Sequence, residues 1–132
     1  MPVASKKYPT KYRGSKEYLL VYCELIRAAR YRGMTTYQAI ADIMGLPLRG
    51  GHMAAEVGQM LGEILQDELD HGRPMLSTIV VSVRGSPGPG FFNLARGVGK
   101  LQDDSKEGEQ RFWEEEKKAV YTTWQKEFKS RT

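Results

Sequence analysis

Apolar residues recur every three or four positions along four segments of the chain, which is the spacing of an amphipathic helix. The segments predicted to be helical in this way are 15–32, 35–44, 52–71 and 109–129. Residues that start or stop helices stand at their ends. Ser15 is a candidate N-cap. Thr35 and Gln38 match a capping box. Gly45 is a candidate terminator, so the pattern predicts a mostly helical chain.

A short stretch between the third and fourth predicted helices has a different pattern. Residues 77–84 are rich in β-branched side chains, which predicts a strand. The glycine- and proline-rich residues 85–90 predict a turn or a wing-like loop. Phe91 and Phe92 then begin either a partner strand or a short helix that runs to Ala95. The whole stretch reads as one tightly specified motif, to which we assign no chemistry.

Three helices followed by a strand and a glycine-rich turn form the element order of a winged helix-turn-helix. We therefore predict a mainly α fold with a small β element (α+β), in which the helical segment 109–129 follows a winged helix-turn-helix-like core. The chain has 132 residues, which suits a single domain. Residues 1–14 are expected to form a flexible basic arm, and residues 15–132 are expected to form that single domain.

Positive charge is concentrated near the N-terminus. Residues 1–32 contain eight of the 20 lysines and arginines but two of the 16 acidic residues, while the whole chain has a net charge of +4. A concentrated basic patch attracts polyanions and speeds the encounter with them. The charge therefore favours nucleic acid as a partner, although a basic tail that only keeps the protein in solution has the same composition.

The residue pattern offers no support for several classes of function. No apolar run approaches the roughly 20 residues that cross a bilayer, and the polar N-terminus lacks the apolar core of a secretory signal. Cys23 is the single cysteine, which suits a reducing compartment, so we expect a cytoplasmic protein without membrane contact. His52 and His71 lie too far apart to share a metal ion. Cys23 has no histidine placed to activate it, so we expect no catalytic residue, no metal site and no cofactor.

One segment resembles a known family. Residues 33–47, which read GMTTYQAIADIMGLP, are similar to the start of the DNA-binding domain of alkylguanine-DNA alkyltransferases and alkyltransferase-like proteins. Residues 54–58, Ala-Ala-Glu-Val-Gly, stand where that family has Ala-Arg-x-Val-Gly on its recognition helix. The resemblance covers about residues 18–85. It implies a winged helix-turn-helix that places the helix 52–71 in the major groove of DNA, with Tyr37 near the DNA backbone.

The departures from this family remove two of its functions. Where the family has its Pro-Cys-His-Arg active site, this chain reads RPMLSTIVV over residues 73–81, without cysteine or histidine, so alkyl transfer is not implied. The arginine that the family inserts in place of a flipped base corresponds to Ala55, so base flipping is not implied either. The resemblance therefore implies a DNA-binding scaffold that neither transfers an alkyl group nor flips a base.

We therefore expect a non-catalytic protein that binds nucleic acid, double-stranded DNA rather than RNA, through the helix-turn-helix-like element and the basic arm. The lysines and arginines of the arm would follow phosphates, and the start of the helix 52–71 would offer backbone amides and cations to them. The predicted contact residues are Lys6, Lys7, Lys11, Arg13, Thr36, Tyr37, Arg49, Gly50, Gly51, His52 and Arg84.

A second interpretation of the same scaffold is open at this point. Glu56, Glu63 and Asp67 give the helix 52–71 an acidic face, which would repel phosphates if it faced DNA. The final helix has an aromatic face that could cover a protein partner or a second copy of the chain. The alternative to nucleic-acid binding is therefore a protein-interaction or assembly module.

Overall fold

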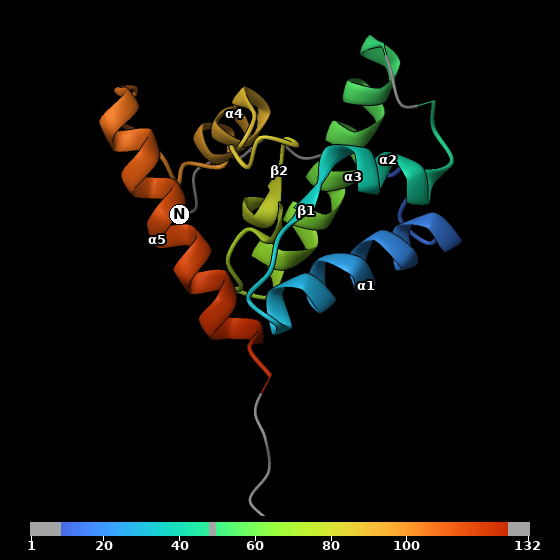
Figure 1. The fold of residues 1–132 in the computed structure, drawn as a ribbon, viewed down its shortest axis with the longest axis horizontal. Helices are drawn as coiled ribbons and strands as arrows, with labels where there is room; N and C mark the ends of the chain where they lie inside the picture. The colour runs from blue at the N-terminus through green and yellow to red at the C-terminus, as the bar shows by residue number, and fades with distance from the viewer. Residues whose placement is uncertain (1–8, 48–49, 127–132) are drawn as a thin grey trace, which may run out of the picture.

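The chain folds into helices arranged around a short buried segment (Figure 1). The computed structural model describes residues 9–47 and 50–126. The elements are α1 (Lys16–Arg30), β1 (Thr35–Thr36), α2 (Tyr37–Met44), α3 (Gly51–Asp70), the 3₁₀ helix η1 (Leu76–Ile79), β2 (Val80–Val81), α4 (Pro89–Gly97) and α5 (Lys106–Trp124). The two strands form a small parallel sheet that begins with the pair Thr35 and Val80. The predicted α+β class, mainly helical with a small β element, is confirmed.

Side-chain hydroxyl groups cap the starts of helices. The Ser15 hydroxyl accepts the backbone N–H of Tyr18 at 3.1 Å, so Ser15 is the N-cap of α1. The predicted capping box at Thr35 is wrong by one residue, because Thr36 caps α2 by accepting the N–H of Ala39 at 3.1 Å. Thr35 is buried within the sheet instead.

The strand predicted at residues 77–84 is mostly wrong. Leu76–Ile79 form η1, and Val80–Val81 are the part that is extended. Residues 76–81 are buried between α1, α3 and α5, so their β-branched and apolar side chains reflect burial, which does not distinguish a strand from a helical turn. Because β2 pairs in parallel with β1, no antiparallel wing hairpin forms within residues 9–47 and 50–126.

The two C-terminal helices match the prediction in part. Of the two alternatives for residues 91–92, the short helix is confirmed, because both residues lie in α4. The final helix begins earlier than predicted, since the Ser105 hydroxyl caps it by accepting the N–H of Gly108 at 3.0 Å. It ends at Trp124, with Gln125 as its C-cap, and the predicted end at residue 129 lies outside the described residues.

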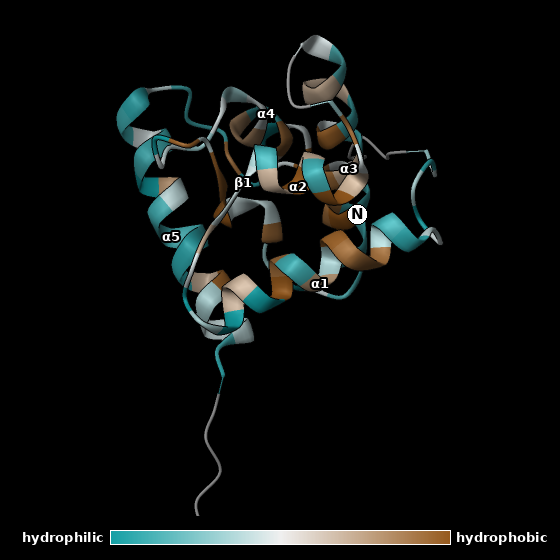
Figure 2. Cartoon of the chain, turned by 45° about the vertical axis from the view of Figure 1, so that its right-hand side comes forward, coloured by the Kyte–Doolittle hydropathy of each residue, from teal (hydrophilic) through white to brown (hydrophobic). Residues whose placement is uncertain are grey.

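Apolar side chains from the surrounding helices meet on η1 and β2. One cluster joins α1, α2, α3 and η1, and a second cluster lies under α4. The indole N–H of Trp113, in α5, donates to the Thr78 carbonyl oxygen at 2.9 Å and so ties α5 to the central segment. Figure 2 shows the apolar residues on the inward sides of α1 and α3, and polar residues over the outside of α5. None of the helices in the described ranges is long and apolar enough to cross a membrane.

The aromatic face of α5 packs inside the protein. Trp113 and Val120 are buried in the two clusters, and Trp124 is half-buried, with the Arg73 guanidinium 5.2 Å from its ring centre. The described part of this face therefore packs largely on the chain's own core, and the idea that the face also covers a partner or a second copy stays a prediction.

Candidate nucleic-acid interface

The start of α3 projects beyond the rest of the molecule (Figure 1). Gly50 is its N-cap, with a φ of +92°, and no described side chain caps the helix there. Gly51, His52, Ala54 and Ala55 are exposed, and the first turn contains no acidic residue. The first N–H groups of a helix have no partner within the helix and carry the positive end of its dipole. This end can therefore accept an anionic group that approaches closely over small side chains.

The acidic face of α3 is covered by residues 9–14. Glu63 is fully buried, and its carboxylate accepts the backbone N–H groups of Lys11 and Tyr12 at 3.1 Å and of Arg13 at 2.8 Å. Glu56 pairs with the Lys11 ammonium at 2.6 Å and accepts the Tyr12 hydroxyl. The prediction of a flexible arm is therefore wrong for these residues, because the buried carboxylate needs their N–H groups as partners.

Further contacts from Arg13 and Tyr18 cover the acidic face of α3. The Arg13 guanidinium lies 3.3 Å from the Asp67 carboxylate, and it also donates to the Glu63 carbonyl oxygen at 3.2 Å. The Tyr18 hydroxyl, from α1, donates to Asp67 as well. Each of the three acids on this face thus has a cation, a hydroxyl or backbone N–H groups against it. The negative charge that argued against phosphate binding is therefore offset in part within the protein, since Lys11 and Arg13 pair with two of the three acids and neutral N–H groups surround Glu63.

The titration of these groups follows from their surroundings. Burial by itself raises the pKa of the Glu63 carboxyl, but hydrogen bonds from Gln59 and from three backbone N–H groups outweigh it and hold that pKa below its ordinary value. The Lys11 ammonium and the Tyr12 hydroxyl lower the pKa of Glu56. Burial and the hydrogen bond to Glu56 raise the pKa of Tyr12 to about 12. At neutral pH Glu56 and Glu63 are therefore ionised, and the Tyr12 hydroxyl remains a donor.

The predicted contact residues fall into three groups: exposed residues, residues held by contacts inside the protein, and residues outside the described ranges. The exposed ones are Gly50, Gly51 and His52, at the start of α3, and Arg84. Arg84 lies on a turn in which the Gly85 N–H donates to the Ser82 carbonyl oxygen at 2.8 Å. Four others, namely Lys11, Arg13, Thr36 and Tyr37, are held by contacts inside the protein, as ion pairs, a helix cap and a hydrogen bond to Gly88. The remaining three, Lys6, Lys7 and Arg49, lie outside the described residues.

Much of the basic charge of the first 32 residues lies at the end of α1. Arg27, Arg30 and Lys126 lie near the exposed Tyr31, and Arg32 follows it in the chain and donates to the Gln125 side chain at 2.9 Å. We call these residues the Tyr31 cluster. The Lys126 ammonium donates to the Tyr31 hydroxyl at 3.1 Å, and this bond together with the nearby cations lowers the pKa of Tyr31. The C-terminal ends of α1 and α5 meet at the end of the molecule opposite the start of α3 (Figure 1). Sequence analysis missed the cluster because Lys126 joins it from 95 residues away.

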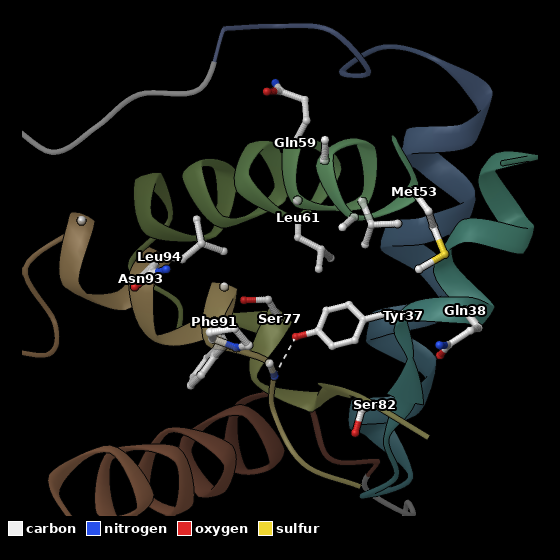
Figure 3. A pocket seen from close by; sticks show the side chains of 18 of the residues that line it. Tyr37, Gln38, Met53, Gln59, Leu61, Ser77, Ser82, Phe91, Asn93 and Leu94 are labelled. Atoms are coloured by element: carbon white, nitrogen blue, oxygen red, sulfur yellow. Dashed lines mark hydrogen bonds between the residues drawn. The ribbon is translucent and has the colours of Figure 1, made fainter. Parts of the chain in front are cut away.

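A cavity of about 620 Å³ lies between α3 and α4, beside the N-terminal half of α3 (Figure 3). Tyr37, at the start of α2, projects into it, and its hydroxyl accepts the Gly88 N–H at 3.2 Å. Two polar atoms on its wall, Ser77 Oγ and Gln38 Oε1, are buried with no hydrogen-bond partner in the described part of the chain. No sequence motif predicts this cavity, because its walls come from four separate segments.

In residues 9–47 and 50–126, no three side chains of the metal-binding types His, Cys, Asp and Glu come together as a set that could hold an ion. The two histidines lie at opposite ends of α3. Comparison of the chain with protein-family models, with curated proteins and with solved structures finds no match in any of the three.

Proposed function

We propose that this chain is a non-catalytic nucleic-acid-binding protein that contacts double-stranded DNA through the start of α3. In this proposal α1, α2 and α3 form the helix-turn-helix-like part of a winged-helix-like core, and the turn that carries Arg84 takes the place of a wing. The first residues of α3 would enter the major groove, as in other helix-turn-helix proteins.

The observation that carries the proposal is that residues 11–13 cover the acidic face of α3. Glu56, Glu63 and Asp67 are matched by residues 11–13, and the exposed first turn of α3 has no acid of its own. A phosphate that approaches this turn therefore meets N–H groups that no described side chain caps, together with the imidazole of His52. Glu56, one turn further along, is already paired with the Lys11 ammonium. The small side chains of Ala54 and Ala55 leave the helix backbone accessible to base edges.

The alternative, a protein-interaction module, is the second candidate that the sequence raises. Its predicted surface was the aromatic face of α5, and that face is occupied by the core. Large apolar side chains are exposed elsewhere, among them Leu19 and Leu20 on α1, but no described contact shows what would cover them. DNA binding is therefore the function that the arrangement supports best.

The proposal is tested with short labelled DNA, duplex and single-stranded, titrated with the protein across a salt series. Duplex binding is expected to weaken at least about tenfold between about 50 and 200 mM salt, because phosphate contacts release counterions. Arg49→Ala, and Lys6→Ala combined with Lys7→Ala, are expected to weaken it further and to flatten the salt dependence. These substitutions leave residues 9–14 on α3, whereas deletion of the whole arm would expose Glu63. Absence of duplex binding at the lowest salt contradicts the proposal.

A further inference from the structure

The described residues that line the cavity between α3 and α4 have no charged side chains. Charged residues make up 27% of the chain, yet none of the described residues that line the cavity is one of them. An ion that entered would lose its hydration and gain no counter-charge. The described lining therefore offers a bound ion no charged side chain as a partner, and the cavity volume of about 620 Å³ lies within the range of small-molecule sites.

Glycines on both walls keep the cavity open. Gly58 lies inside α3, and Gly90 lies in the first turn of α4. A Cβ added to either residue would meet no atom within 4 Å, and neither residue has a positive φ. Glycine inside a helix is less stable than alanine, so neither packing nor backbone conformation explains Gly58. Free space in the cavity is the physical advantage that remains.

An unsatisfied hydroxyl, that of Ser77, lines the same cavity. Ser77 is 5% exposed, and its Oγ has no hydrogen-bond partner among the described residues. The adjacent Thr78, fully buried, donates its hydroxyl to the Met75 carbonyl oxygen at 2.5 Å. Figure 3 shows Ser77 between the Leu94 and Tyr37 side chains at the edge of the open space. Buried polar groups are normally paired, so this hydroxyl marks the place where a bound molecule would supply the missing partner.

We propose that this cavity binds a small uncharged molecule with a compact apolar body and one hydrogen-bonding end. The body would lie against Gly58, Leu61 and Leu94, and the polar end would pair with the Ser77 hydroxyl. The occupant is a free ligand, so the proposal stands or falls independently of DNA binding at the start of α3.

The test is an NMR titration of the full isotope-labelled chain with a panel of uncharged fragments. Benzamide is the first member, and benzoate, which has the same shape with a negative charge, is its matched control. Benzamide is expected to shift the backbone amides of Gly58, Gly90 and Asn93 in a saturable way, and benzoate is expected to leave them in place. If benzoate shifts these amide signals as benzamide does, the claim that the cavity prefers uncharged molecules is wrong.

Two variants separate the site from nonspecific binding. Ser77→Ala removes the hydrogen bond and is expected to weaken benzamide binding about tenfold. Gly58→Leu fills the cavity and is expected to abolish the shifts, while the rest of the spectrum keeps its dispersion. The proposal is overturned if no uncharged fragment moves the cavity amides, or if both variants bind benzamide as the natural chain does. Should Gly58→Leu fail to fold, Ser77→Ala decides the question alone.

Discussion

The buried Glu63 carboxylate accepts the backbone N–H of Arg13 at 2.8 Å, across 50 residues of sequence. This bond, with those from the two preceding residues, fixes the N-terminal segment to the middle of α3. It places the Lys11 and Arg13 side chains against Glu56 and Asp67. One buried acid therefore determines both where the segment lies and how the charge of α3 is balanced.

The first prediction concerns Glu63→Gln. The glutamine side chain brings an NH₂ group towards backbone N–H donors and loses the charge-assisted hydrogen bonds, so we expect a loss of about 2–3 kcal/mol in the free energy of unfolding at pH 7. Urea unfolding measures this loss. The exposed Glu115→Gln is the control and is expected to stay within about 0.5 kcal/mol of the natural chain.

The stability lost in Glu63→Gln should also depend on pH, and the direction of the change follows from the pKa of Glu63. The folded protein lowers the pKa of the Glu63 carboxyl, so its contribution is present above the ordinary pKa of about 4.3 and is lost as the pH falls through the lower, folded value. The stability difference between Glu63→Gln and the natural chain should stay constant from about pH 6 to 8 and shrink in acid. A difference that grows in acid contradicts the assignment.

The second prediction compares two adjacent buried hydroxyls. Thr78→Val removes a hydroxyl that is bonded to the Met75 carbonyl oxygen, and it should cost about 1 kcal/mol. Ser77→Ala removes a hydroxyl without a described partner, and it should leave stability unchanged or raise it by up to about 1 kcal/mol. Thermal and urea unfolding of both variants measure the contrast. Equal losses in the two variants would show that the Ser77 hydroxyl is paired.

The third prediction compares two glycines inside helices. A Cβ at Gly58 meets nothing within 4 Å, so Gly58→Ala should stabilise the protein by about 1 kcal/mol through helix propensity. A Cβ at Gly108 would overlap the Asp103 side chain, so Gly108→Ala should destabilise the protein. The melting temperatures of the two variants should therefore move in opposite directions, and a fall for Gly58→Ala would show that glycine is needed there for packing.

The helices were predictable because their signals are local. The apolar spacing and the hydroxyl at Ser15 are read within one turn of helix, and the order of elements follows from them. The error at Thr35 arose because both threonines suit a cap, and sheet pairing with Val80 decided between them. The error at residues 77–84 has a similar origin, since complete burial produces the same apolar run in a strand and in a 3₁₀ turn.

The arrangement of the candidate site was less predictable because its partners are distant in sequence. Lys11 and Arg13 are basic residues near a terminus, and their sequence context does not reveal that Glu56 and Asp67 neutralise them. The cavity is likewise assembled by the fold from α2, α3, η1 and α4. Its one local signal is Gly58, a glycine inside a strongly predicted helix.

The central claim is that the start of α3 binds duplex DNA, and His52→Glu tests it most directly. An acid in the first turn suits the helix dipole, so the variant should fold at least as stably as the natural chain. It should weaken duplex binding about tenfold or more at low salt, because the new carboxylate faces phosphate. Gln102→Glu, which adds the same charge at an exposed position outside the proposed interface, should stay within about twofold. An equal loss of duplex binding in both variants, or no loss in His52→Glu, contradicts the claim. The Tyr31 cluster would then be the next surface to test for DNA binding.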